Sequence, residues 1–108
     1  MVKYSDSIDM TFSALADSTR RDILRRSLTE KHTISSLASS YHMSFTAVAK
    51  HVKVLSDSGL IRKTRAGREQ LIEANVTKLQ EIRDLLDSYE TLWRERMEQL
   101  DTLLIHLP

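Results

Sequence analysis

A chain of 108 residues with 41% hydrophobic and 29% charged side chains has the size and composition of one small folded domain. It contains no cysteine, which excludes disulfides, thiolate metal sites and cysteine nucleophiles. The sequence has no apolar signal segment and no run of about 18 apolar residues, so we expect a cytoplasmic protein without a membrane partner.

The charge is unevenly distributed along the chain, although the net charge is only +1. Residues 1–74 carry 12 Lys and Arg against 8 Asp and Glu, whereas residues 75–108 carry 4 against 7. Between Ser44 and Arg68 there are six bases and one acid, a local charge of +5. Such a block suggests an anionic surface as partner. The alternative is a basic face that contacts only solvent.

The first part of the chain predicts three short amphipathic helices, because apolar residues recur three or four positions apart. The first is expected around Ile8–Leu15, and the second begins after Asp17 or Ser18, whose oxygens can cap it. A polar break at residues 30–32 precedes a third helix that begins at Thr33 or Ile34. The predicted inward residues are Ile8, Phe12 and Leu15, then Ile23, Leu24 and Leu28, then Ile34, Leu37, Ala38 and Tyr41.

A tight turn at residues 42–44 leads to a fourth helix, which is expected from the N-cap Ser44 to about Asp57. Its core face is Val48, Val52 and Leu55, at positions i, i+4 and i+7. Gly59 follows where a helix end favours a left-handed residue.

Two strands are expected next, at residues 60–64 and 69–73, joined by the turn Arg65-Ala66-Gly67-Arg68. Two helices separated by a short turn and followed by a basic hairpin make a winged helix-turn-helix. We therefore predict a mainly α fold with a small β-hairpin wing.

The fourth helix is the predicted recognition helix, because Thr46, Lys50 and Lys53 lie opposite its core face at 100° per residue. Residues near its N-terminal end are placed to touch base edges, and the free amides around Ser44 can bind a phosphate. His51 either donates to a DNA phosphate or packs locally. The residues predicted to bind double-stranded DNA are Ser44, Phe45, Thr46, Ala47, Ala49, Lys50, His51 and Lys53, with Arg65 and Arg68 of the wing on phosphates or in a minor groove.

From about Thr77 the apolar spacing becomes heptad-like, and neither Gly nor Pro occurs before Pro108. This predicts one helix of roughly 30 residues, about 45 Å long. A stripe of that length exceeds what a small domain covers, so we predict a homodimer, with residues 1–76 as the DNA-binding domain and 77–108 as the dimerisation helix. The predicted interface comprises Ile8, Phe12, Leu79, Ile82, Leu86, Tyr89, Trp93, Leu100 and Leu103.

Four segments together resemble one family of regulators. FSALADSTRRDIL (residues 12–24), SFTAVAKHVKVL (44–55), GLI (59–61) and RAGR (65–68) resemble the arsenic-repressor (ArsR) family of winged-helix regulators of bacteria and archaea. The helix end LWRERMEQLDTL resembles the subgroup without metal sites, which includes autorepressors. The resemblance implies a homodimeric repressor on a palindromic operator. His42 stands where the family often has Gly, and Phe45 where a polar residue is frequent; a Phe can touch a thymine methyl.

No metal, cofactor or catalytic residue is expected. The four histidines include no pair at i and i+4, and SSLAS (residues 35–39) stands where the family's thiolate motif would fall. With two glycines, the chain assembles no phosphate-binding loop, catalytic triad or paired-carboxylate pocket.

Two other functions stay open: a winged-helix module for protein interaction or assembly, and a regulator that responds to a small molecule or a metal. Bases on both the recognition helix and the wing favour DNA over the interaction module. The sequence indicates no particular inducer.

Overall fold

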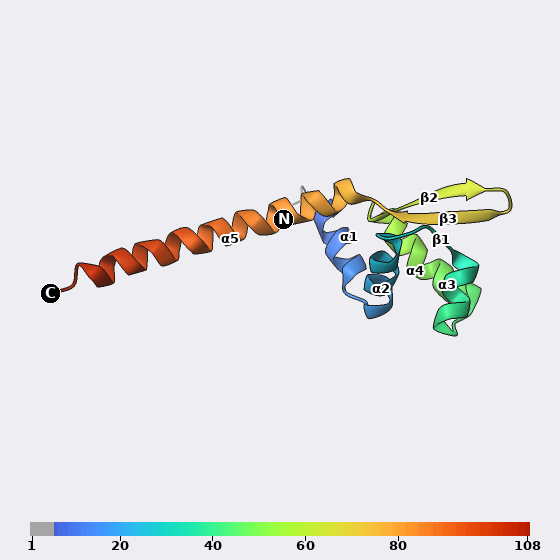
Figure 1. Cartoon of the computed structure of the whole chain (residues 1–108), viewed down its shortest axis with the longest axis horizontal. Coiled ribbons are helices and arrows are strands. Elements are labelled where there is room, and N and C mark those ends of the chain that lie inside the picture. Colours follow the sequence, from blue (N-terminus) through green and yellow to red (C-terminus); the bar gives the residue numbers. More distant parts are fainter. Residues whose placement is uncertain (1–5) are drawn as a thin grey trace. The chain divides into compact units, whose positions relative to one another are not determined.

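The computed structural model describes residues 6–108, which form two compact units that divide between Lys78 and Leu79. The fold is mainly α-helical with one small antiparallel sheet, as predicted (Figure 1). The elements are α1 (Asp6–Leu15), α2 (Ser18–Ser27), β1 (His32–Thr33), α3 (Ile34–Tyr41), α4 (Phe45–Asp57), β2 (Ile61–Ala66), β3 (Glu69–Ala74) and α5 (Val76–Ile105). Among the described helices, none is long and apolar enough to cross a membrane.

Three helices begin at side-chain caps, and two of these caps, Asp17 and Ser44, are predicted from the sequence. The Asp17 carboxylate accepts from the Arg20 amide at 3.0 Å, and the Ser44 hydroxyl oxygen accepts from the Ala47 amide at 3.1 Å. Thr33 and Ser36 form a reciprocal capping box at the start of α3. Each cap satisfies an amide that has no partner inside its helix, which sets where the helix starts.

The helices α3 and α4 end in the same way, with one left-handed residue each. At the end of α4, Gly59 has φ +82°, and the Leu60 amide donates to the Leu55 carbonyl at 3.0 Å. At the end of α3, His42 has φ 54° and ψ 39°, and the Met43 amide donates to the Ala38 carbonyl at 3.0 Å. Both ends are Schellman motifs. His42 therefore holds a backbone conformation that favours glycine.

The sheet has the order β1-β3-β2 and differs from the prediction in two respects. The hairpin strands are longer than expected: Arg65 and Ala66, predicted in the turn, belong to β2, so the turn is reduced to Gly67-Arg68. Gly67 has φ +64° and Arg68 has no positive φ, which is the pattern of a type II′ turn. The segment predicted as a polar break also contains strand β1, in which His32 pairs with Ile72.

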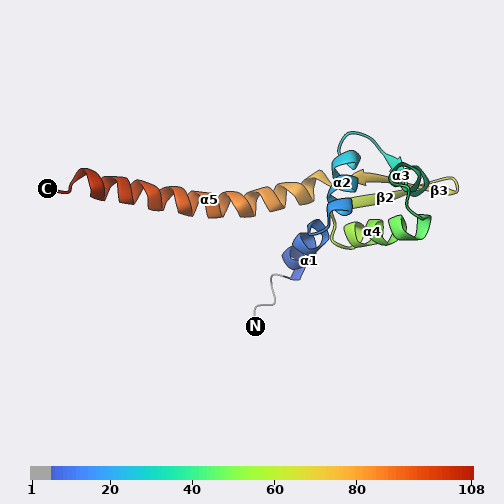
Figure 2. The ribbon, with the colours of Figure 1, turned by 90° about the horizontal axis from the view of Figure 1, so that it is seen from below.

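The core lies where α2, α3 and α4 pack against each other and against the hairpin (Figure 2). Seven predicted inward residues are buried: Ile23, Leu24, Leu37, Ala38, Val48, Val52 and Leu55. Leu28, the C-cap residue of α2, is 51% exposed, so its predicted inward position is wrong. In α1 the buried residues are Thr11 and Ala14, whereas the predicted inward Phe12 is exposed.

Candidate nucleic-acid interface

Helix α4 has one face in the core and the other in solvent. Val48, Val52 and Leu55 are almost completely buried, whereas Thr46, Lys50 and Lys53 are exposed. The helix follows α3 after a turn of three residues, and α3 packs beside it (Figure 1). This is the geometry of a helix-turn-helix whose second helix presents its polar face outward.

The start of α4 presents polar and apolar groups to solvent together. Ser44, Phe45 and Thr46 are exposed, and the Phe45 side chain is 56% exposed. Ala47 and Ala49 are half-buried. The Ser44 hydroxyl caps the Ala47 amide, which leaves the amides of Phe45 and Thr46 without partners inside the helix. Amides at such a helix start favour a phosphate.

The two lysines of α4 differ in their partners. Lys53 forms an ion pair with Asp57 at 2.8 Å, one turn further along the helix, and both side chains are largely exposed. Such surface pairs contribute little to stability and give way to a stronger anion. The Lys50 side chain makes no hydrogen bond or ion pair with the rest of residues 6–108. Its ammonium group is therefore free for a ligand.

His51 lies apart from these residues, in a half-buried junction of three helices. Its Nδ1 atom lies 3.7 Å from the Asp17 carboxylate and 3.5 Å from the Arg20 guanidinium. Arg20 also donates to the Ala14 and Ser13 carbonyls at the end of α1, at 2.7 and 3.0 Å. These contacts favour local packing as the role of His51. The sequence pattern missed Arg20, because its partners come from α1 and α4.

The pKa of Asp17 reflects the same junction. The Arg20 amide that donates to the carboxylate lowers this pKa below its ordinary value; partial burial opposes the shift, and the charges of His51 and Arg20 lower it further. Asp17 therefore stays ionised and holds both the start of α2 and the side chain of His51.

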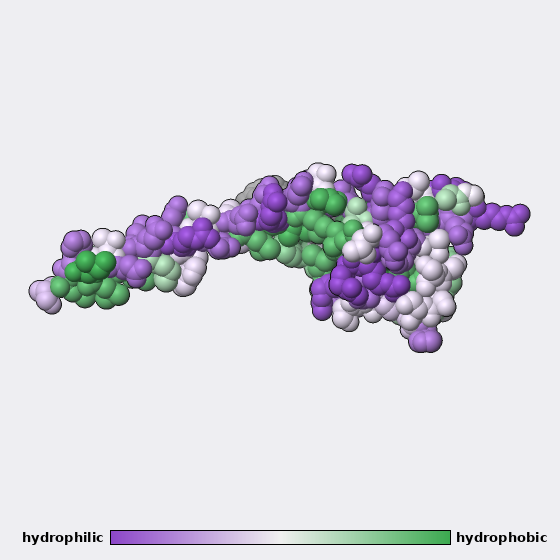
Figure 3. Space-filling view, in the orientation of Figure 1, coloured by the Kyte–Doolittle hydropathy of each residue, from purple (hydrophilic) through white to green (hydrophobic). Residues whose placement is uncertain are grey.

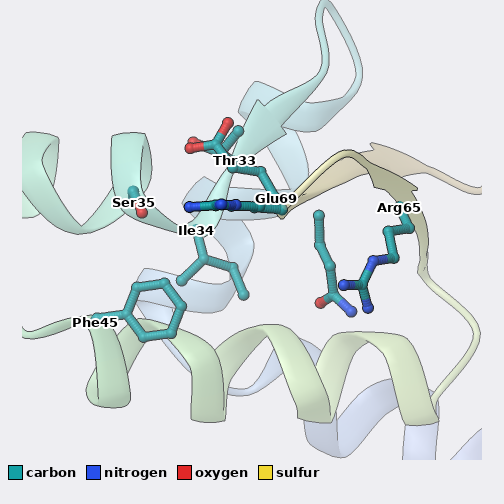
Figure 4. A pocket seen from close by; sticks show the side chains of 8 residues that line it. Thr33, Ile34, Ser35, Phe45, Arg65 and Glu69 are labelled. Atoms are coloured by element: carbon teal, nitrogen blue, oxygen red, sulfur yellow. The ribbon is translucent and has the colours of Figure 1, made fainter.

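The wing presents its arginines at the tip of the hairpin. Arg65 stands opposite Gln70, and its Nε atom donates to the Gly67 carbonyl at 3.2 Å. Side chains alternate between the two faces of a strand, so Arg65 and Gln70 share the face that carries the buried Ile72. In Figure 4 the Arg65 side chain extends toward α4.

A pocket of about 230 Å³ lies between the wing, the start of α3 and the start of α4 (Figure 4). We call it the wing pocket, and it is lined by Thr33, Ile34, Ser35, Phe45, Arg65, Arg68, Glu69 and Gln70. It brings together three residues predicted to bind DNA, Phe45, Arg65 and Arg68. The other five were not predicted, because their proximity depends on the pairing of β1 with β3.

The residues predicted for dimerisation fall into two groups. Ile82 is 8% exposed and thus already buried in the single chain, whereas Ile8 and Leu79 are half-buried. Exposed apolar side chains are Phe12 in α1 and Leu86, Tyr89, Trp93, Leu100 and Leu103 in α5. Figure 3 shows apolar surface at the C-terminal end of α5, where Leu103, Leu104, Ile105 and Leu107 are exposed.

The histidines do not gather with acidic residues into a metal centre. In residues 6–108 no group of three or more His, Asp and Glu side chains is placed to hold a metal ion. His32 approaches Glu30 at 3.5 Å, and this contact is a single pair. Independence from metals stays a prediction that needs a binding experiment.

Comparison with known proteins gives consistent relatives. No family model matches the chain. A relative from Bacillus subtilis, the uncharacterized HTH-type transcriptional regulator YuzN, is 40% identical over 74 residues, covering 62% of this chain and 80% of that protein. The solved ArsR family transcriptional regulator RHA00566 is 32% identical with a TM-score of 0.78, covering 87% of this chain and 97% of that one.

A second similar structure is the homodimeric winged helix-turn-helix DNA-binding domain of Mb0332 from Mycobacterium bovis. It is 19% identical with a TM-score of 0.66, covers 79% of this chain and 80% of that one, and supports the fold alone. The fold, the solvent-facing helix α4 and the two relatives above 30% identity agree. The chain belongs to the ArsR family of winged helix-turn-helix, DNA-binding transcriptional regulators.

Proposed function

We propose that the protein is a homodimeric repressor that binds a palindromic operator and does not sense metal. One observation carries the DNA-binding face: exposed bases occur on both α4 and the wing tip, while the opposite face of α4 is buried. An interaction module has no need for bases in both places. Residues 1–76 then serve as the DNA-binding domain and residues 77–108 as the dimerisation helix.

The proposed contacts divide by position. Phe45, Thr46 and Lys50 enter the major groove, because they lie on the exposed side of α4 near its start. The backbone amides of Phe45 and Thr46, which follow Ser44, hold a DNA phosphate. Arg65 and Arg68 contact DNA phosphates or the minor groove next to that major groove. Ala47 and Ala49 flank the groove contacts near the start of α4, and Lys53 adds positive charge. His51 supports α4 through its contacts with Asp17 and Arg20.

The second copy of the chain is proposed from the apolar stripe of α5. Leu86, Tyr89, Trp93, Leu100 and Leu103 follow one another at spacings of three, four, seven and three residues along a 30-residue helix, and all are exposed in the single chain. Two such stripes can pair as in a coiled coil. The Mb0332 domain, which shares this fold, is itself homodimeric, and we propose the same assembly for this chain. A two-fold axis would place two recognition helices about 34 Å apart, one turn of DNA.

The test is selection of DNA from a random library by the full chain, followed by titration of the selected sequence at several salt concentrations. We expect two symmetric half-sites and an affinity that falls steeply as salt increases. An affinity that ignores both sequence and salt would contradict the DNA-binding proposal. A selected site with one half only would contradict the palindromic arrangement.

A further inference from the structure

The wing pocket combines an apolar side with a cationic rim. Phe45 and Ile34 lie next to each other on one side, and Arg65 lies across from them (Figure 4). Phe45 is 56% exposed although its side chain is large and apolar. An exposed ring beside a second apolar side chain favours a ligand with an apolar face.

The guanidinium groups at the pocket have N–H groups without partners among the described residues. Arg68 makes no hydrogen bond or ion pair with other described residues, and Arg65 uses only its Nε atom, on the Gly67 carbonyl. Glu69 is the one acidic residue among those lining the pocket. Two guanidinium groups against one carboxylate favour an anion, and each guanidinium can hold a carboxylate through paired N–H groups.

The start of α3 adds donors on the same side. The Thr33 hydroxyl oxygen already accepts from the Ser36 amide, so the amides of Ile34 and Ser35 lack partners inside α3. The Ser35 side chain is exposed and lines the pocket. These donors supplement the arginines, which carry the charge.

We propose that the wing pocket binds a small aromatic carboxylate, with its ring on Phe45 and Ile34 and its carboxylate on Arg65 and Arg68. The volume of about 230 Å³ lies below the usual range for drug-sized ligands, so the ligand is of the size of a single substituted ring. A bare phosphate would fill the cationic rim and leave the apolar side uncovered.

Binding there releases the protein from DNA. This part rests on the proposed function, because Phe45, Arg65 and Arg68 are also proposed DNA contacts. A carboxylate that occupies both guanidinium groups withdraws them from backbone phosphates and places a negative charge where the DNA would lie. The small molecule and DNA therefore exclude each other.

The first experiment is an NMR titration of the full-length chain with benzoate, compared with benzamide, which lacks the charge, and acetate, which lacks the ring. We expect saturable benzoate binding with a Kd of about 1 mM and shifts of the Ser35, Phe45 and Gln70 amides. The wild type should bind benzamide and acetate about tenfold more weakly than benzoate, and the variant Arg68→Gln should bind benzoate about tenfold more weakly than the wild type does. The control Arg83→Gln changes an exposed arginine of α5 and should bind as the wild type does.

The outcomes separate the two proposals. Benzoate that does not saturate, shifts residues elsewhere or binds no better than benzamide overturns the pocket. In the second experiment, benzoate is added to the protein–DNA complex at constant ionic strength, and the apparent Kd for DNA should rise over the concentrations that fill the pocket. If the pocket fills while DNA affinity stays constant, competition is wrong and the wing contacts of the proposed function fail. A protein that binds benzoate and no DNA refutes the function alone.

Discussion

The solvent-facing bases differ in the element that carries them, and this difference predicts different effects on DNA binding. Lys50 lies on the exposed face of α4, whereas Arg68 lies in the turn of the wing. A side chain in the major groove can distinguish bases, and one on a phosphate cannot.

Replacing Arg68 with Ala should weaken binding to all sequences alike and reduce the salt slope by about one. Replacing Lys50 with Ala should cost about 1–3 kcal/mol and relax the preference at one base pair. Titrations of the selected operator and its point mutants at matched salt measure both effects. Arg83→Ala, on α5, is the control, and unchanged affinity for both variants would contradict the groove model.

The left-handed residue His42 gives a prediction on stability. A non-glycine residue at φ 54° carries backbone strain that glycine avoids. His42→Gly should therefore raise the free energy of unfolding by about 0.5–1 kcal/mol, and His42→Val should lower it by about 1–2 kcal/mol, since a β-branched residue fits this region worst. Urea unfolding measures both. A valine variant as stable as the wild type would show that the turn relaxes to another conformation.

Between elements, a side-chain hydrogen bond joins α2 to α3, the first helix of the helix-turn-helix. The Tyr41 hydroxyl of α3 donates to the Asp22 carboxylate of α2, and the Arg26 guanidinium lies 5.2 Å from the centre of the Tyr41 ring. The hydrogen bond from Tyr41 lowers the pKa of Asp22 below its ordinary value of 3.8, and that from Arg25 lowers it further. The contact therefore stabilises the ionised carboxylate.

Removing this hydroxyl should make stability less dependent on acid pH. Tyr41→Phe should lower the free energy of unfolding at neutral pH by about 1 kcal/mol. A lowered folded-state pKa stabilises the fold above the ordinary value of 3.8 and loses this effect as the pH falls through the folded-state value. The difference in the free energy of unfolding between variant and wild type should thus shrink as the pH falls through the folded-state pKa of Asp22. Thr91→Val removes a hydroxyl at an exposed position of α5 outside the predicted interface and should show no such difference. A gap independent of pH would exclude the Asp22 contact as its cause.

At the scale of the whole molecule, the assembly decides whether two recognition helices act together. Leu100 and Trp93 are 42% and 63% exposed in the single chain, so the fold of one chain does not depend on them. Burying such a side chain contributes roughly 1.5–3 kcal/mol, and a symmetric dimer buries each of them twice.

Leu100→Glu or Trp93→Glu should therefore dissociate the dimer and abolish specific binding. Light scattering should give twice 12.5 kDa for the wild type and 12.5 kDa for the variants. Thr102→Glu introduces the same charge on the opposite side of α5 and should stay dimeric. A wild-type monomer that still binds a palindromic operator tightly would defeat the dimer proposal.

Metal ions should leave DNA binding unchanged. The chain has no cysteine, and no cluster of metal-ligand side chains is found among residues 6–108. The affinity for the operator with zinc and with a chelator should agree within roughly threefold, which is less than about 1 kcal/mol. A tenfold change would contradict this and would point to a histidine–carboxylate site between the subunits, since residues 6–108 of one chain hold no such cluster.

The sequence by itself determined the features that depend on neighbours along the chain. Caps such as Ser44, the buried face of α4 and the turn at Gly67 follow from local hydrogen bonds and from the 3.6-residue and two-residue periods. The exposure of Thr46, Lys50 and Lys53 follows from the same period, and DNA binding by this face stays a prediction.

Tertiary structure alone decided the features made by residues far apart in sequence. Strand β1 has two residues, too few to show a period, and exists because β3 supplies its hydrogen bonds. The contacts of His51 with Asp17 and Arg20 join segments more than 30 residues apart. The wing pocket likewise needs α3, α4 and the hairpin in one place. A local sequence pattern cannot predict these contacts, because the packing of the whole core brings the segments together.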